Sequence, residues 1–433
     1  MSEQFSQEII ARDAVAGFPS RRDGRSSEVR RPMATSLAHT ALFERHQSLG
    51  ATFEAYAGWE LPKFYTSIEE EYAAARERVA VVDRSHVSKM KVTGRDRLDL
   101  LHRLTTQYFF YKNKDARQPF NDPSEDPDAL KAGEGREAAL ITAKGRIIDY
   151  LLVYGFEDSL LVLFSSRNRE RVPQWIDGFV FREDFQMTDV TAQQAMLLLL
   201  GPQASTTVET LAGQSVASLP MHHFITPTIG GAPVIVARTW NLGSIGAVRP
   251  CPSFHLITPV ENAVNLWDVL IERGVQPVGE DVYEVLRIEA GLPVVGKELS
   301  EEVNPWEARL DAAIHLAKGC YTGQEVIARI QTYQKVHKRL LAGIRLIEAR
   351  LPEPGSKVTA AGRDVGFITS AARSPALGNI ALAYVHGEYD DPGVRVTVHT
   401  PSGDVEGIVA SLPFVAASGE TPHPQSHDLT SST

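Results

Sequence analysis

The sequence has 433 residues, of which 43% are hydrophobic and 23% are charged. This composition is typical of a folded globular protein, and the length corresponds to two or three domains rather than one. The formal net charge is -10, so we expect no sequence-specific nucleic acid partner. With only two cysteines, the chain cannot form a disulfide scaffold or a self-contained four-cysteine iron-sulfur or zinc site.

Residues 1–35 are polar and mixed in charge, and they lack the continuous apolar stretch of a secretory signal. We expect a disordered N-terminal extension there. Its arginines faintly resemble a transit peptide, but the acidic residues among them argue against one, and Met33 is an alternative initiator. No apolar run approaches the roughly 20 residues that span a bilayer, so we expect a cytoplasmic protein without membrane contact.

Residues 36–335 alternate short apolar segments with amphipathic ones, which predicts an α+β region. A strand is expected to end at Met90 to Val92. The next segment, Thr93-Gly-Arg-Asp96, has the spacing of a capping box. It precedes a predicted helix whose apolar face is formed by Leu98, Leu101 and Leu104.

Residues 108–137 interrupt this pattern with Pro, Gly and acidic residues, and we expect a polar insertion loop, either functional or ornamental. Residues 139–142 and 147–154 then predict a β-hairpin, followed by a strand over 160–164. The turn Ala143-Lys-Gly-Arg146 would expose a basic tip. An all-apolar segment, residues 195–200, predicts a buried strand.

Helices are predicted over residues 267–272 and 281–290. In residues 336–415, short apolar segments separated by Gly, Pro and Ser turns predict a C-terminal β-barrel. Its expected strands are residues 358–360, 365–370, 380–385, 394–398 and 407–412. Residues 416–433 form a polar tail that we expect to be disordered.

The sharpest local motif is Lys318-Gly-Cys-Tyr-Thr-Gly-Gln-Glu325, which leads into a predicted helix. Cys320 lies just before the helix N-terminus and beside a lysine, and both neighbours favour the nucleophilic thiolate. The alternative is a buried structural cysteine, although the flanking glycines favour an accessible sulfur. Cys251, between two prolines, has no such setting, and we interpret it as structural.

Glu289 occupies the position where the apolar stripe of the 281–290 helix should continue. It also lies in the last helical turn, where the helix dipole disfavours a negative charge. Such local conflicts are common at functional sites, and this carboxylate could accept two hydrogen bonds from the amidine edge of a pterin. The alternative is an ion pair with a nearby arginine such as Arg287 or Arg309.

Several segments of the sequence resemble known protein families. Lys318 to Glu325 resembles the signature of the YgfZ-type folate-binding proteins, which assist iron-sulfur cluster assembly or repair. The segments 83–107, 286–308 and 366–385 are similar to that group and to its relative, the glycine cleavage T-protein, an aminomethyltransferase. The resemblance covers roughly residues 38 to 415. It implies two intertwined α+β domains and a C-terminal barrel around a folate channel.

The resemblance assigns roles to individual positions. Glu289 matches the T-protein acid that contacts the pterin. The T-protein segment with its catalytic aspartate matches Gly145-Arg-Ile-Ile-Asp149-Tyr150, and our alignment places that aspartate at Tyr150. Strand alternation should send Asp149 and Tyr150 to opposite faces, so Asp149 is not a simple replacement. A Tyr-Thr-Gly-Glu segment is also altered here, to Trp240-Asn-Leu-Gly243.

The resemblance thus implies a tetrahydrofolate-binding accessory protein for iron-sulfur clusters, with Cys320 as a reactive or cluster-bridging thiolate. One cysteine cannot supply four ligands, so a cluster would be transient and shared with a scaffold or client protein. Lys318, Arg146, Lys338 and Arg339 are the candidates for binding the folate glutamate tail. The alternatives are a folate-dependent aminomethyltransferase, one-carbon transferase or demethylase that depends on Asp149, and a module that only binds folate.

Overall fold

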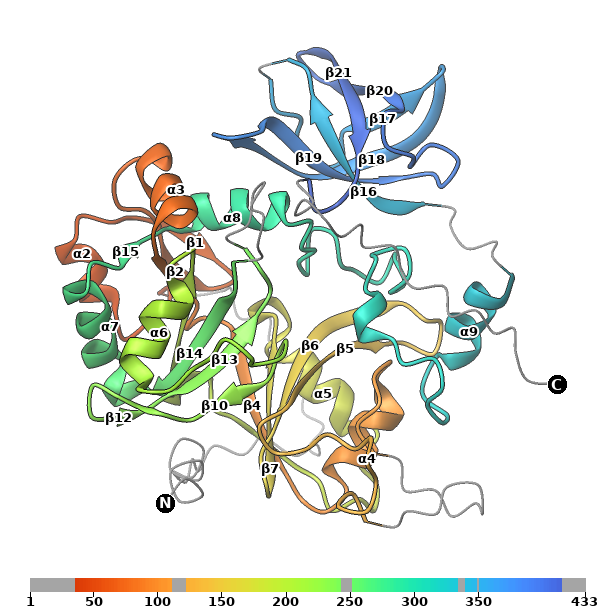
Figure 1. Cartoon of the computed structure of the whole chain (residues 1–433). Helices are drawn as coiled ribbons and strands as arrows, with labels where there is room; N and C mark the ends of the chain where they lie inside the picture. The colour runs from red at the N-terminus through yellow and green to blue at the C-terminus, as the bar shows by residue number, and fades with distance from the viewer. Residues whose placement is uncertain (1–35, 111–121, 243–250, 334–338, 349, 415–433) are drawn as a thin grey trace, which may run out of the picture.

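The computed structural model describes residues 36–110, 122–242, 251–333, 339–348 and 350–414, which form two main β-sheets and a barrel (Figure 1). The predicted N-terminal extension and C-terminal tail lie outside the described residues. Figure 1 places the barrel against α8, on one side of the two sheets. None of the described helices combines the length and hydrophobicity of a transmembrane span.

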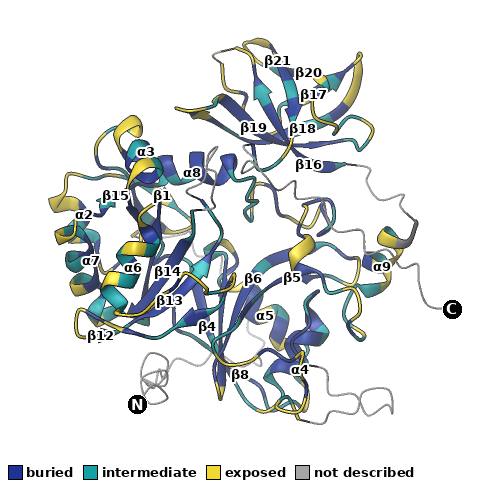
Figure 2. Ribbon diagram, in the orientation of Figure 1, coloured by how far each residue is buried: buried dark blue, intermediate teal, exposed yellow. Residues whose placement is uncertain are grey.

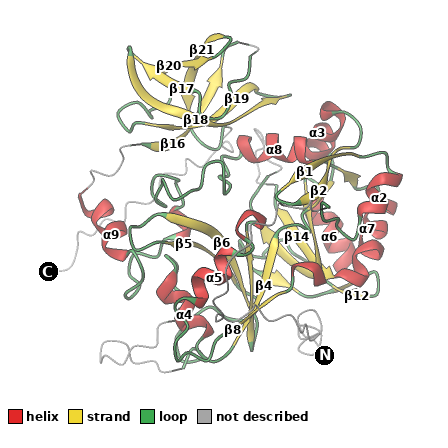
Figure 3. Cartoon of the chain, turned by 180° about the vertical axis from the view of Figure 1, so that it is seen from behind, coloured by secondary structure: helices red, strands yellow, loops and turns green. Residues whose placement is uncertain are grey.

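The larger sheet contains the segment that the sequence identifies as most apolar. Residues 195–200 lie in β9, whose side chains are all buried, as predicted. Helices α2, α6 and α7 cover the outer face of this sheet, as the view from behind shows (Figure 3). The predicted helix over 267–272 is confirmed as part of α7. The strands are, in sheet order, β10 (Phe224–Ile225), β13 (Ile235–Thr239), β14 (Ser253–Pro259), β9 (Gln194–Leu200), β3 (Ala80–Asp83) and β15 (Gln276–Pro277); the helices are α2 (Phe43–Ser48), α6 (Ala204–Ala212) and α7 (Ala263–Glu272).

The second sheet contains the predicted hairpin and the strand after it. Apolar side chains on one face pack against α4 and α5. The helix with Leu98, Leu101 and Leu104 is confirmed, but its predicted capping box is wrong: Thr93 ends β4, and the cap residue Asp96 instead accepts a hydrogen bond from the backbone N–H of Asp184. The strands are, in sheet order, β5 (Gly135–Ile141), β6 (Ile147–Gly155), β7 (Ser159–Phe164), β4 (Ser88–Thr93) and β8 (Gln186–Asp189); the helices are α4 (Arg97–Leu104) and α5 (Arg171–Asp177).

The chain passes between the two sheets twice. It leaves β3 for β4 through residues 84–87, and it leaves β8 for β9 through residues 190–193. The facing sides of the sheets pack through Leu152, Met196, Ile257 and their neighbours. Figure 2 shows that the strands of both sheets and much of α8 consist of buried residues. The larger sheet therefore combines β3, before the first crossing, with strands that follow the second crossing, and the second sheet is formed by the segment inserted between them.

The predicted polar loop over residues 108–137 needs correction. Residues 111–121 lie outside the described residues, but Phe109, Phe110 and Leu130 are buried in the core beside α4. Residues 135–137 already belong to β5. The end of this segment therefore begins the edge strand of the second sheet. Its polar composition hides the strand, because the adjacent Arg136 and Glu137 interrupt the apolar pattern.

The C-terminal region is a closed barrel of strands, as predicted, with interior residues such as Ile344, Val358 and Val398 forming its own core. The five predicted strands are found, and the first strand, β16, is the one that the sequence analysis did not assign. The strands are, in barrel order, β16 (Leu340–Leu346), β19 (Gly378–Val385), β18 (Arg363–Ser374), β17 (Lys357–Ala360), β20 (Arg395–Thr400) and β21 (Gly403–Ala410).

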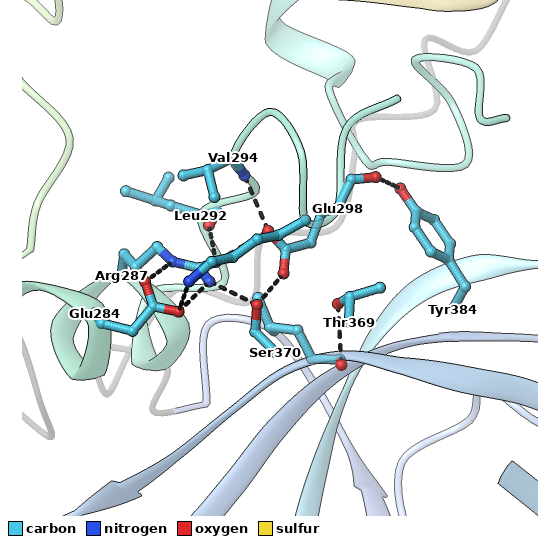
Figure 4. Close-up of polar contacts among 10 residues, drawn as sticks. Glu284, Arg287, Leu292, Val294, Glu298, Thr369, Ser370 and Tyr384 are labelled. Atoms are coloured by element: carbon cyan, nitrogen blue, oxygen red, sulfur yellow. Dashed lines mark hydrogen bonds and ion pairs between the residues drawn. The ribbon is translucent and has the colours of Figure 1, made fainter. Parts of the chain in front are cut away.

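Helix α8 (Glu280–Glu289) connects the barrel to the rest of the molecule through a buried ion pair (Figure 4). Arg287 donates to Glu298 over 3.0 Å, and both side chains are 0% exposed. Ser370, on β18, donates to the other oxygen of Glu298, and Tyr384, on β19, donates to its backbone carbonyl. Glu298 is therefore paired with a cation and saturated by hydrogen bonds, which is the condition under which a buried charge is stable.

Candidate functional site

A cavity of about 740 Å³ lies between the two sheets and the segments that lead to the barrel. The first crossing contributes Arg84, His86 and Val87. Further walls come from β6, from β13 and β14, and from three segments near the barrel. Those three segments are residues 290–295, 306–312 and 412–413. The cavity therefore lies where the chain first crosses between the two sheets.

Asp149 and Tyr150 both line this cavity, although they leave β6 in different directions. Asp149 accepts hydrogen bonds from the Asn168 side chain (2.8 Å) and from the backbone N–H of Ser165 (3.2 Å). Tyr150 instead donates to Glu137. Strand alternation thus gives the two side chains different partners, but it does not keep either of them out of the cavity lining.

Burial changes the acidity of Asp149. The side chain is fully buried, and desolvation raises its pKa to about 7, although hydrogen bonds from Asn168, Ser165 and Tyr150 act in the opposite direction. A carboxyl group with this pKa can take up or release a proton near neutral pH. By contrast, burial and the nearby Glu137 charge raise the pKa of Tyr150 well above its usual value, so its phenol stays neutral.

Glu137 is a cavity residue that the sequence analysis missed. It lies on β5 and accepts hydrogen bonds from His222 Nε2 (2.6 Å) and Trp240 Nε1 (2.5 Å) on the same oxygen, and another from Tyr150. Burial opposes its ionisation, but these hydrogen bonds outweigh burial and lower its pKa. One sequence feature could have revealed Glu137. Every second residue of β5 from 137 onward, Glu137, Ala139 and Ile141, shares one face of the strand, and Glu137 is the acid among apolar residues.

Two buried polar atoms at the cavity wall have no hydrogen-bond partner among the described residues: His86 Nδ1 and Thr239 Oγ1. Their side chains are 1% and 0% exposed, so bulk water does not satisfy them. Buried polar atoms are normally paired, and unpaired ones beside a cavity indicate contacts for a bound polar molecule. An organic ligand with both hydrogen-bonding groups and flat rings fits this wall, which also contains Tyr56 and Tyr283.

Arg84 and Arg309 are arginines of the cavity lining, and each already has an acidic partner. Arg84 donates to Glu280 over 2.6 Å and stacks over the Tyr283 ring at 3.9 Å. Arg309 donates to Asp390 over 2.8 Å. The cationic charge of both side chains is therefore compensated within the protein, and Arg309 is not the partner of Glu289 that the sequence analysis considered.

Glu289 is the last residue of α8 and lies outside the set of described residues that line the cavity. Its carboxylate pairs with Arg76 of α3 (Ile68–Glu77) and accepts hydrogen bonds from Tyr72, at 2.8 Å, and from Ser374. The arginine partner is thus neither Arg287 nor Arg309. The neighbouring residues Ala290 and Gly291 do line the cavity, so Glu289 lies one residue away from its wall.

The motif around Cys320 folds onto the second sheet, away from the cavity. Cys320 is exposed, four residues before α9 (Gln324–Tyr333). Lys318 is buried, and its Nζ donates to the backbone carbonyls of His102, Thr105 and Gln107 over 2.6–2.7 Å. Burial lowers the pKa of Lys318 to about 6, but three carbonyl acceptors match the three N–H groups of an ammonium. Lys318 therefore anchors the motif to the end of α4.

Two glycines allow this motif to contact the β5–β6 hairpin. Gly323 has φ +79°, and a Cβ added there would lie 2.7 Å from the carbonyl oxygen of Thr142. Gly145, at the hairpin tip, has φ +69°, and a Cβ there would lie 2.9 Å from Val326 of α9. The sequence analysis expected an exposed tip. Lys144 is exposed as expected, but Gly145 is covered by α9.

The candidate residues for a folate tail are only partly assembled. Arg146 and Arg339 both donate to the backbone carbonyl of Glu302, over 2.7 and 3.3 Å, so these two lie together. Lys318 is anchored elsewhere, and Lys338 lies outside the described residues. None of the described candidates lines the cavity. Across the described ranges, no group of three or more His, Cys, Asp or Glu side chains is arranged to hold a metal ion.

Comparison with known families identifies the superfamily. Residues 42–318 match the GCVT N-terminal domain, and residues 339–416 match the glycine cleavage T-protein C-terminal barrel domain. The chain therefore belongs to the glycine cleavage T-protein superfamily, which the segments quoted above predict.

Individual relatives agree with this placement. The aminomethyltransferase of Halalkalibacterium halodurans is 30% identical over 387 residues, covering 88% of this chain and 98% of that protein. The aminomethyltransferase of Geobacillus kaustophilus is 32% identical over 387 residues, covering 87% and 98%. The crystal structure of glycine cleavage system aminomethyltransferase T from Bartonella henselae matches with a TM-score of 0.74 and 23% identity, covering 88% of this chain and 98% of that one. This last similarity confirms the predicted α+β fold with its C-terminal barrel.

Proposed function

We propose that this protein is a folate-dependent one-carbon transferase related to the aminomethyltransferases. The observation that carries the proposal is the buried carboxyl group of Asp149, with a pKa of about 7, on the wall of a cavity large enough for an organic ligand. The names of the relatives support the same reaction class. The transferase function is preferred to the iron-sulfur role because these relatives are named for the transferase activity.

Tetrahydrofolate, when bound, would supply the nitrogen atoms that accept a one-carbon unit. The protein's own contribution is to hold the ligand through His86 Nδ1 and Thr239 Oγ1, which have no hydrogen-bond partner among the described residues, and to place its rings between aromatic side chains. Asp149 would exchange a proton with the reacting amine near neutral pH. Tyr150 would keep its phenolic proton and orient Glu137.

Binding of folinic acid, measured by titration calorimetry, tests the ligand. Saturable binding to the wild-type chain is expected, together with tetrahydrofolate-dependent turnover of an aminomethyl or methylated-amine substrate that Asp149→Asn lowers at least about a hundredfold. Glu289→Ala tests the pterin assignment that the resemblance makes. Because Glu289 is held by Arg76, Tyr72 and Ser374, unchanged affinity in a folded Glu289→Ala variant would assign it to structure alone.

A second candidate function is an accessory role in iron-sulfur cluster assembly or repair, as in the YgfZ-type proteins. One observation favours it: Cys320 is exposed, and Lys318 and Gly323 hold its motif in place away from the cavity. A transient cluster would be shared with a scaffold or client protein, since one thiolate supplies one ligand. The test is complementation by Cys320→Ala, with Cys251→Ala as the matched control. Full activity of [4Fe-4S] enzymes in cells that carry Cys320→Ala would remove this role.

A further inference from the structure

Glu137 is a buried carboxylate without a lysine or arginine partner in the described structure. Its side chain is 8% exposed, and it pairs with the imidazole of His222. Among the described residues, no lysine or arginine forms an ion pair with it. The hydrogen bonds from Tyr150 and Trp240 stabilise the carboxylate without neutralising its charge. A buried charge in this condition is costly unless an opposite charge is brought to it.

His222 belongs to the immediate surroundings of Glu137. Its Nε2 donates to Glu137, while its Nδ1 is buried and has no hydrogen-bond partner in the described structure. The carboxylate therefore receives hydrogen bonds from three side chains, those of Tyr150, Trp240 and His222.

None of the described basic side chains that line the cavity forms an ion pair with Glu137. The lining arginines, Arg84 and Arg309, have their own carboxylate partners, Glu280 and Asp390. The imidazole of His255, also in the wall, is kept neutral because burial lowers its pKa to about 3. The region of the cavity around Glu137 is therefore electronegative.

The surroundings of Glu137 are aromatic. The rings of Tyr150 and Trp240 have centroids 6.1 Å apart and are inclined by 30°, and both side chains line the cavity. The His222 ring packs edge-on against Trp240, with centroids 5.2 Å apart, and fixes its orientation. A carboxylate beside two electron-rich rings is the chemical environment that proteins use to bind ammonium groups.

We propose that Glu137, Tyr150 and Trp240 form a subsite for the cationic amine of a substrate. The subsite would hold an alkylated ammonium group, with Glu137 as its counter-ion and the two rings as its walls. Identification of this amine as the one-carbon donor rests on the proposed transferase function, but the binding itself does not.

The test uses titration calorimetry on the full-length protein at pH 8. The probe is choline, and its neutral control is the carbon analogue in which a tert-butyl group replaces the trimethylammonium group. Wild-type protein is expected to bind choline at least about tenfold more tightly than the analogue. Glu137→Gln keeps the shape and an acceptor oxygen for Trp240, and it should abolish this discrimination. Asp364→Asn removes an exposed carboxyl group of the barrel that is not among the residues lining the cavity, and it should retain the discrimination.

Equal affinity of the wild type for the two probes would overturn the subsite, and so would discrimination that persists in Glu137→Gln. If Glu137→Gln does not fold, Trp240→Leu provides the second variant, with the same loss expected. Folinic acid titrations of the same samples separate the two proposals. Folinic acid binding without charge discrimination rejects the amine subsite alone, whereas charge discrimination without folinic acid binding supports the subsite and rejects the folate-dependent function.

Discussion

Two buried glutamates of this protein have opposite surroundings. Glu298, between α8 and the barrel, pairs with a fully buried arginine and is hydrogen-bonded by Ser370. Glu137, on the cavity wall, is held by hydrogen bonds from His222, Trp240 and Tyr150, with no lysine or arginine partner among the described residues. Burial alone therefore does not separate structural from functional carboxylates, but pairing with a buried arginine does. By this criterion Glu289, paired with Arg76, resembles Glu298.

The largest loss of stability is expected when the buried ion pair between Arg287 and Glu298 is broken. Arg287→Ala would leave Glu298 as an unpaired buried charge and should lower the free energy of unfolding by about 3–5 kcal/mol. Urea unfolding followed by circular dichroism measures this. Lys357→Ala, in an exposed ion pair with Asp364, is the control and should change stability by less than about 1 kcal/mol. Equal effects of the two variants would contradict the role of Arg287.

A smaller effect is expected from the pH dependence of Asp149. Its pKa is raised by burial from 3.8 to about 7, so between these values the folded state keeps a proton that the unfolded state loses. Stability should therefore fall as pH rises from about 4 to about 7, by roughly 2–4 kcal/mol relative to Asp149→Asn. Thermal unfolding across this range measures it. A constant difference between wild type and variant would show that Asp149 is ionised throughout.

Neutralising Glu137 should change the free energy of unfolding less than breaking the Arg287–Glu298 ion pair does. Glu137→Gln retains an acceptor for His222 and Trp240, and it removes a charge that burial disfavours. We expect its free energy of unfolding to change by less than about 1 kcal/mol, because charges kept for binding often contribute little to stability. Urea unfolding without ligand is the measurement. A loss of unfolding free energy as large as that of Arg287→Ala would mean that Glu137 mainly stabilises the fold.

The smallest effect on stability is expected from substitution of Cys320, because its side chain is exposed and takes no part in the buried ion pairs described above. Cys320→Ser should change the free energy of unfolding by no more than about 0.5 kcal/mol and leave folinic acid affinity unchanged. Chemical unfolding and calorimetry on the same sample measure both. A weakened affinity for folinic acid would mean that the Cys320 motif and the cavity act together.

Sequence patterns predicted the strands and the barrel because these elements depend on local alternation and turns. They could not predict the surroundings of the buried charges. Glu289 was singled out because it breaks the apolar stripe of its helix, but its partner Arg76 lies in α3, far away in sequence. Glu137 was missed because it follows a polar segment, and because His222 and Trp240 reach it only through the packing of the two sheets.

The contact between Gly145 and Gly323 couples two distant segments of the chain. Both residues have positive φ, and an added Cβ at either one would collide with the segment that carries the other. One of these segments is continuous with the strand that carries Asp149, and the other follows directly on Cys320. A larger residue at either glycine would therefore displace both segments at once, so a substitution in the Cys320 motif can disturb the strand that carries the proposed catalytic carboxyl group.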